Sequence, residues 1–253
     1  MLIDVHAHLD DKRFSKDRED VIKKIQEQNI VVINAGSDIP TSRFSIELAE
    51  EHDFIYACVG VHPHEAKGVP EDYIDTLREL AENPKVIAIG EIGLDYHYDF
   101  SDRPTQKRIF WEQLELAKQL DMPVVIHDRE AHQDTVDMLK KSGIKRGLMH
   151  CFSGSMDMAK ELIKFGFYFS FGGPITFKNA KRPKVTAANI PLEKILLETD
   201  CPYLTPEPFR GKRNDPTMVK LVAQSLADLK RLSYEVVQAA VYENAKRLFN
   251  LPI

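Results

Sequence analysis

The sequence is poor in cysteine and has no long apolar run. Its three cysteines are widely spaced, odd in number and form no CxxC pair, which argues against a disulfide framework and favours reduced thiols. No apolar run reaches membrane-spanning length, and the first fifteen residues carry His and Asp where a signal peptide needs a basic start and an apolar stretch. We therefore expect a cytoplasmic protein without a membrane partner.

Positive charge is also in deficit. Lysine and arginine total 34 against 39 aspartates and glutamates, a formal net charge of −5, which argues against a protein that coats nucleic acid by bulk attraction. The chain has no Ser/Gly-rich linker and no low-complexity tract, and 43% of its 253 residues are hydrophobic. We therefore expect a single domain over 1–253 with a sizeable core, and we infer no obligatory protein partner.

Short apolar runs alternate with segments of helical spacing along the chain. The runs cover 2–9, 30–36, 54–61, 86–92, 122–126, 147–152, 167–172 and 194–199. Helical spacing covers 18–28, 72–81, 106–120 and 156–165, and two more such segments, 217–230 and 234–248, end the chain. This alternation predicts an α/β protein, a (β/α)8 TIM barrel with additional C-terminal helices. The competing doubly wound sheet usually carries a glycine-rich turn after its first strand, where "HAHLDD" has none.

Titratable side chains recur at the carboxyl ends of these predicted strands. In chain order they are His6 and His8, His62 and His64, Glu91 and Asp95, His127 and Arg129, His150, and Glu198 and Asp200. In a β/α barrel these ends converge on one mouth, where active sites form. Asp4 and Glu198 fit either a site or a hydrogen bond in the barrel interior, and lone histidines such as His52 and His132 are expected to be hydrogen-bonded structural residues.

Imidazole and carboxylate groups are the ligands that zinc, manganese and iron prefer, and oxygen-rich sets suit magnesium. The candidate ligands are more than one ion takes in a catalytic site: His6, His8, Glu91, His127, His150 and Asp200. They predict two divalent ions per chain, with Mg²⁺, Mn²⁺ and Zn²⁺ as candidates. Two dications held close together repel each other unless a carboxylate is shared, and Glu91 is the candidate bridge. Asp200 is also the candidate general base.

The strand-end motifs resemble those of the TatD family of metal-dependent nucleases, in the amidohydrolase-like barrel superfamily. The motifs are "DVHAHLD", "GVHPH", "GEIGLDY", "VIHDREA", "HCFSGS", "LETDCPYLTP" and "RGKRNDP", with Asp215 where the family often has Glu. The resemblance implies a two-metal hydrolase acting on DNA, with Glu91 and Asp200 in the catalytic centre. It implies one ion on His6, His8, Glu91 and Asp200, and the other on Glu91, His127 and His150.

Basic residues near the last two predicted strands offer a local contact for phosphate. They are Lys178, Lys181, Arg182, Lys184, Arg210, Lys212 and Arg213, in loops that often form the phosphate site of a β/α barrel. The candidate substrate contacts are His62, His64, Arg129, Arg210 and Arg213, and an aromatic among Tyr96, Tyr98 and Phe100 could stack on an unpaired base. We therefore expect a 3′–5′ exonuclease acting on single-stranded or frayed DNA.

Two other functions fit parts of the same pattern. Relatives of this barrel cleave amides and lactones with nearly the same ligands, so an amidohydrolase or lactonase acting on a small metabolite is the alternative enzyme. Many of those use a modified lysine on the fourth strand, where this chain has Glu91. A metal-stabilised scaffold without activity is the other alternative, although structural metal sites are usually closed by protein ligands.

Overall fold

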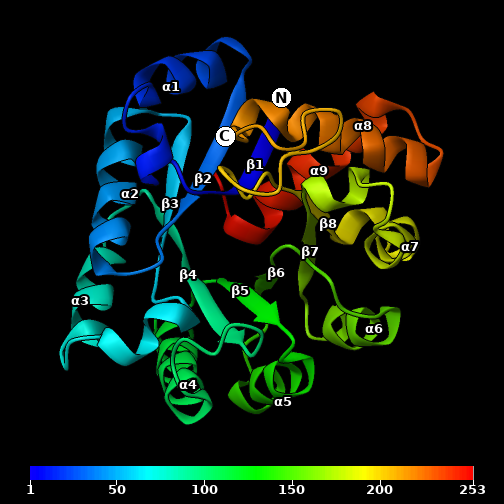
Figure 1. Ribbon diagram of the computed structural model, residues 1–253. Coiled ribbons are helices and arrows are strands. Elements are labelled where there is room, and N and C mark those ends of the chain that lie inside the picture. The colour runs from blue at the N-terminus through cyan, green and yellow to red at the C-terminus, as the bar shows by residue number, and fades with distance from the viewer. Residues whose placement is uncertain (253) are drawn as a thin grey trace. The chain divides into compact units, whose positions relative to one another are not determined.

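The computed structural model describes residues 1–252. Within this range, eight strands alternate with helices, and their order in the sheet follows their order in the chain (Figure 1). The fold class is therefore α/β with (β/α)8 topology, which confirms the prediction. The strands are β1 (Leu2–Ala7), β2 (Ile30–Ala35), β3 (Ile55–Val59), β4 (Val86–Asp95), β5 (Val124–Arg129), β6 (Gly147–Met149), β7 (Tyr168–Phe171) and β8 (Ile195–Leu197).

Helices follow the strands in regular alternation. They are α1 (Arg18–Glu27), α2 (Ile39–Glu51), α3 (Tyr73–Leu80), α4 (Arg103–Gln119), α5 (His132–Ser142), α6 (Met156–Lys164), α7 (Lys181–Asn189), α8 (Val219–Lys230) and α9 (Tyr234–Phe249). Of the two C-terminal helices that the sequence predicts, α8 follows β8 as the eighth helix of the repeat, and α9 is the addition.

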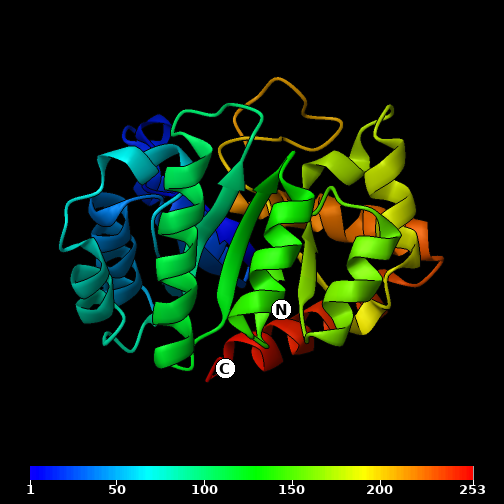
Figure 2. The ribbon, with the colours of Figure 1, turned by 90° about the horizontal axis from the view of Figure 1, so that it is seen from below.

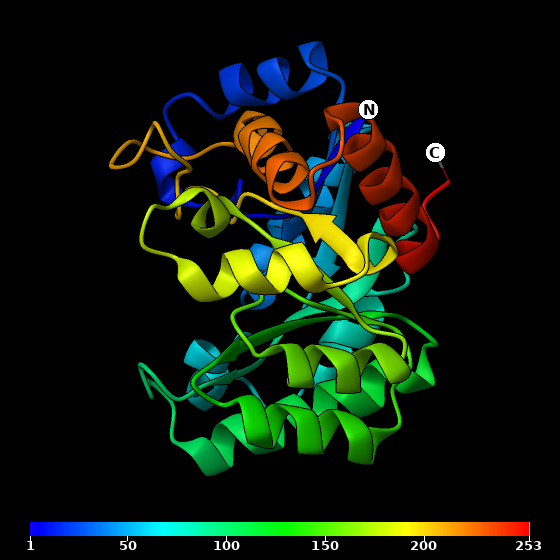
Figure 3. The same ribbon diagram turned by 90° about the vertical axis from the view of Figure 1, so that its right-hand side faces the viewer.

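The contacts divide the described residues into two compact units, and the first contains both ends of the described chain. It comprises residues 1–34, 151–159 and 168–252. Within it, β1 pairs with β2 and β7 pairs with β8, both in parallel. Helices α8 and α9 contact β1 and β8 (Figure 3). All six residues of β1 are buried, as expected for a parallel strand that is covered on both faces.

The second unit comprises residues 35–150 and 160–167. Its strands β3, β4, β5 and β6 pair in parallel in that order, and α4 and α5 run alongside β4 and β5 (Figure 2). Gly93 lies opposite His127 in the β4–β5 pairing, with φ +147. A Cβ atom at Gly93 would lie 1.9 Å from the carbonyl oxygen of His127. Only glycine fits there, so this residue lets β4 pass close beside a candidate ligand.

The prediction of a single domain over 1–253 stays a prediction.

Local signals in the sequence explain where several helices begin. Asp102 accepts a hydrogen bond from the backbone N–H of Thr105, and Pro104 occupies the first turn of α4. The same arrangement opens α2, where Asp38 and Thr41 form a reciprocal capping box. Such caps satisfy backbone N–H groups that have no partner inside the helix.

One placement of basic residues was wrong. Lys181, Arg182 and Lys184 do not lie in a loop after β7, because they form the first turns of α7. Across residues 1–252, no helix combines the length and apolar character needed to cross a membrane.

Candidate active site

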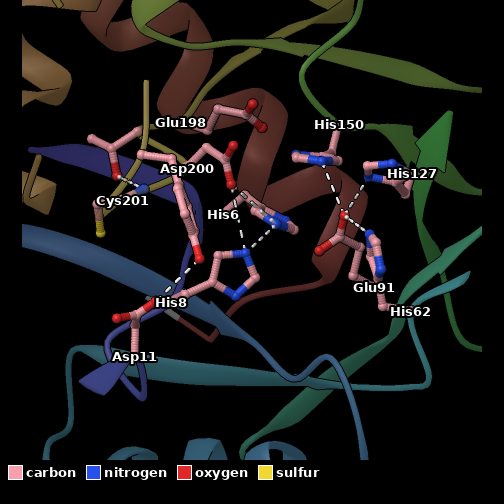
Figure 4. A network of polar contacts seen from close by, with 12 residues as sticks. His6, His8, Asp11, His62, Glu91, His127, His150, Glu198, Asp200 and Cys201 are labelled. Carbon is pink, nitrogen blue, oxygen red and sulfur yellow. Dashed lines mark hydrogen bonds and ion pairs between the residues drawn. The ribbon is translucent and has the colours of Figure 1, made fainter. Parts of the chain in front are cut away.

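The first unit brings together His6, His8 and Asp200, which we call the His6 group (Figure 4). The Nε2 atoms of His6 and His8 are 3.2 Å apart. Asp200 Oδ1 lies 3.5 Å from Nε2 of His8 and 4.0 Å from Nε2 of His6. His6 lies in β1, His8 directly follows β1, and Asp200 lies in the segment after β8. Pairing between these segments sets the distance between the donors.

Backbone hydrogen bonds hold the two segments of the His6 group in register. The N–H of Asp200 donates to the carbonyl of His6 at 3.0 Å, and the N–H of His8 donates to the carbonyl of Cys201 at 2.9 Å. Deeper in the unit, the buried carboxylate of Asp4 accepts hydrogen bonds from the backbone N–H and the hydroxyl of Thr199. Burial raises the pKa of Asp4 despite these bonds. Of its two predicted roles, Asp4 takes the structural one.

The donor atoms of the His6 group fit one divalent ion. All of its potential ligand atoms lie within 4.8 Å of one another. Ligands about 2.1 Å from a tetrahedral zinc ion lie about 3.4 Å apart, and the three separations found here are 3.2, 3.5 and 4.0 Å. The set of two imidazoles and one carboxylate leaves coordination positions for water or substrate, as in a catalytic rather than a structural site.

The second unit gathers three imidazoles around the buried carboxylate of Glu91, which we call the Glu91 group (Figure 4). Oε1 of Glu91 lies 2.8 Å from Nδ1 of His127, 3.1 Å from Nε2 of His150 and 3.4 Å from Nε2 of His62. The donors come from β4, from β5 and from the segments that follow β3 and β6. This convergence of imidazoles on a carboxylate also has the donor chemistry of a divalent metal site.

His62 differs from the other imidazoles of the Glu91 group. Its Nδ1 accepts a hydrogen bond from the backbone N–H of His64 at 3.1 Å. Burial lowers the pKa of His62 to about 4 against the opposing effect of Glu91, so the ring is neutral at pH 7. A neutral ring that accepts at Nδ1 carries its proton on Nε2, the atom that faces Glu91. This tautomer donates from Nε2, although His62 also belongs to a group of potential metal ligands with Glu91 and His127.

Asp95 is a site residue that appeared among the strand-end side chains but was not predicted to act. It is buried, and its Oδ2 lies 2.9 Å from Nε2 of His64 and 3.1 Å from Nε2 of His127. Burial alone would raise its pKa, but the hydrogen bonds with His127, His64 and the backbone of Tyr98, together with the charge of His127, lower it overall. Asp95 is thus a carboxylate that orients His127. Its position four residues after Glu91, on the same side of an alternating strand, is the signal in the sequence.

The arginines predicted to contact substrate lie in different surroundings. Arg129 is exposed at the end of β5, with its guanidinium 4.8 Å from the ring centroid of Tyr98. Arg210 is exposed in the loop after β8, where it lines a cavity of about 630 Å³ with Phe177, Lys178 and Glu207 (gold loop in Figure 3). Arg213 instead forms a two-pronged ion pair with Asp17, at 2.7 and 2.6 Å.

The remaining candidates have structural contacts. The hydroxyl of Ser170 donates to the buried carboxylate of Glu198 at 2.5 Å. Cys58 and Cys201 are buried, and burial raises the pKa of both thiols. A buried thiol with a raised pKa is a poor nucleophile.

Known proteins with the same sequence features identify the family. The family model described as TatD related DNase matches residues 3–250. YabD of Bacillus subtilis (strain 168), an uncharacterized metal-dependent hydrolase, is 47% identical, over 99% of this chain and 100% of its own length. A protein of Erwinia tasmaniensis named 3'-5' ssDNA/RNA exonuclease TatD is 34% identical, over 99% of this chain and 100% of its own.

A solved structure agrees with these matches. The crystal structure of YjjV, a TatD homologue from Escherichia coli K12, superimposes with a TM-score of 0.92 and 32% identity, covering 99% of this chain and 98% of that one. The resemblance seen in the motifs is therefore confirmed over the whole sequence. The chain belongs to the TatD family of metal-dependent hydrolases.

Proposed function

We propose that this hydrolase is a divalent-metal-dependent exonuclease that removes nucleotides from the 3′ end of single-stranded DNA. The observation that carries the proposal is the gathering of imidazole and carboxylate donors into the His6 group and the Glu91 group. The relative named as a 3'-5' ssDNA/RNA exonuclease supports the choice of nucleic acid over a small amide or lactone.

We assign one ion to His6, His8 and Asp200, and a second to Glu91, His127 and His150. When bound, two divalent ions would neutralise charge on the phosphoryl oxygens and favour ionisation of the attacking water. The predicted sharing of Glu91 between the ions stays a prediction, which the metal counts described in the Discussion test.

Side chains of this protein would carry the proton transfers and hold the substrate. Asp200 is assigned as the general base that accepts a proton from the attacking water. The backbone N–H of Asp200 donates to the carbonyl of His6, and the carbonyl of Asp200 accepts from the backbone N–H of Tyr203. These bonds fix the backbone that carries the carboxylate. We assign His62, whose Nε2 faces Glu91, as a contact beside the phosphoryl group. Arg129 and Arg210 supply exposed guanidinium groups for neighbouring phosphates.

The test compares linear and circular single-stranded DNA of the same sequence. The metal-free protein is reloaded with Mg²⁺, Mn²⁺ or Zn²⁺, and its metal content is measured before the assay. We expect a 3′ label to be released before a 5′ label, and the circle to stay intact. Equal cleavage of circle and linear strand would reject the exonuclease assignment. A fully loaded protein that cleaves no DNA or RNA strand, but hydrolyses a lactone or amide, would reject the nuclease assignment itself.

A further inference from the structure

Two large aromatic side chains lie exposed beside the Glu91 group, in the segment between β4 and α4. Tyr98 is 47% exposed and Phe100 is 55% exposed. Their rings are stacked, with centroids 5.2 Å apart and planes 23° apart. Single exposed apolar residues are common on proteins, whereas these two rings are stacked on each other beside a candidate site.

The segment that carries this pair is anchored to the site carboxylate Asp95. The backbone N–H groups of His97 and Tyr98 donate to Oδ1 of Asp95, at 3.0 and 2.9 Å. Oδ2 of the same carboxylate contacts His64 and His127. The position of the aromatic pair is therefore tied by hydrogen bonds to the imidazoles of the proposed catalytic centre.

Two further side chains surround the aromatic pair. The His64 ring meets both aromatics edge-on, with centroid distances of 5.4 Å to Tyr98 and 4.8 Å to Phe100. The Arg129 guanidinium lies 4.8 Å from the ring centroid of Tyr98. Tyr98 thus already contacts a cation and a second ring, whereas Phe100 exposes the larger fraction of its side chain. Phe100 is the ring best placed to accept another flat group.

We propose that Tyr98, Phe100 and Arg129 form a nucleotide-binding site, in which an unstacked base packs on Phe100 and Arg129 contacts a nearby phosphate. The proposal rests on the proposed nuclease function and names the feature of the substrate that the enzyme reads. Stacking on an aromatic face is available to every base and requires that the base be free of its neighbours. The site therefore selects single strands and frayed ends over intact duplex, without reading sequence.

The first experiment measures how cleavage depends on the base. Oligonucleotides with an ordinary 3′-terminal region are compared with otherwise identical strands that are abasic there. We expect wild type to favour the strand with bases about tenfold in kcat/KM. Phe100→Leu should bring this ratio close to one, and Phe100→Trp should restore it. Tyr242→Leu is the control, because it removes a tyrosine that also has a cation over its ring, Lys246, but lies on α9.

A preference for bases that survives Phe100→Leu would overturn the proposal. So would equal cleavage of the two strands by wild type, an outcome that leaves the nuclease function standing. The melting temperature of each variant is measured alongside, so that a folding defect is recognised directly.

A binding measurement separates this proposal from the nuclease proposal. A strand carrying 2-aminopurine near its 3′ end is titrated with protein in the presence of chelator, so that no cleavage is needed. We expect the fluorescence to fall on binding to wild type and to change little with Phe100→Leu. Such quenching in a protein that cleaves no strand would support the aromatic site and reject the nuclease function. Equal quenching by wild type and Phe100→Leu would overturn the aromatic site.

Discussion

The imidazole of His127 lies between two carboxylates: Glu91 contacts its Nδ1 and Asp95 contacts its Nε2. Nε2 of His127 lies 3.1 Å from Oδ2 of Asp95, and its Nδ1 lies 2.8 Å from Oε1 of Glu91. Metal-binding histidines commonly donate their second ring nitrogen to a carboxylate, which fixes the tautomer and makes the other nitrogen a better ligand. The geometry gives Asp95 this supporting role, although it is not itself an assigned ligand.

Replacing Asp95 by Asn should weaken metal binding without unfolding the protein. The amide keeps the size of the side chain but removes the charge that orients His127. We therefore expect the affinity for the ion assigned to Glu91, His127 and His150 to fall about 10- to 100-fold. Competition titrations with a fluorescent chelator measure this change. Asp134→Asn is the matched control, because Asp134 contacts Tyr96 and Lys107 but no site imidazole. Equal affinities for wild type and Asp95→Asn would show that His127 needs no such support.

Replacing Glu91 by Ala tests the assignment of a shared ligand. If Glu91 serves both ions, the variant should keep its fold and lose most of its bound metal, falling from about two equivalents to less than one. Elemental analysis of the purified protein gives the count, and circular dichroism checks the fold. Glu115→Ala, on the surface of α4, should keep the wild-type metal content. A Glu91→Ala protein with two equivalents would remove the bridging role.

Gly93 offers a test of the backbone that carries the site. Gly93→Ala forces a Cβ into the carbonyl oxygen of His127 and places alanine at φ +147. We expect the free energy of unfolding to fall by about 3 kcal/mol, as measured by urea denaturation. Gly68→Ala is the comparison, since no atom of residues 1–252 lies within 4 Å of a Cβ there, and its effect should stay within about 0.5 kcal/mol. Similar losses for both would mean that β4 shifts away from His127 at little cost.

Arg210 and Arg213 should separate substrate binding from stability. Arg210→Ala removes an exposed cation, so the slope of log affinity against log salt for single-stranded DNA should become shallower by about 0.7. Arg213→Ala breaks the ion pair between Arg213 and Asp17, whose side chains are 31% and 38% exposed, respectively. Because the pair is partly exposed, its loss should lower the free energy of unfolding by about 0.5 to 1 kcal/mol. Salt titrations and urea denaturation measure the two effects. If Arg213→Ala instead reduced the salt dependence of DNA binding, Arg213 would be a substrate contact.

Much of the fold could be predicted because parallel strands covered on both faces appear as apolar runs. The ends of strands were harder to place. β4 and β5 continue to Asp95 and Arg129 because their backbones stay paired, residue for residue, beyond the apolar part. The sequence pattern did not predict helix α7, because its first turns contain Lys181, Arg182 and Pro183, a composition that resembles an exposed loop.

The candidate site was predictable where strand geometry alone decides it. His6 lies in β1 and His8 directly follows that strand, and strand ends gather in this fold, so their meeting with Asp200 follows from topology. The role of His62 depends instead on a backbone N–H from His64, and that of Arg213 on Asp17, 196 residues away. Contacts of this kind depend on loop conformation, which no local pattern in the sequence specifies.

The proposed ligands lie in paired strands or within three residues of a strand end, whereas the side chains proposed to hold the nucleotide lie mostly on the connecting segments. Phe100 and Arg210, for example, belong to connections that tolerate insertion and substitution far better than β1 or β4 does. Substrate preference can therefore diverge among descendants of one ancestor while the hydrolytic chemistry stays the same. Matching metal ligands in two homologues therefore do not by themselves indicate a shared substrate. The connecting segments must match as well.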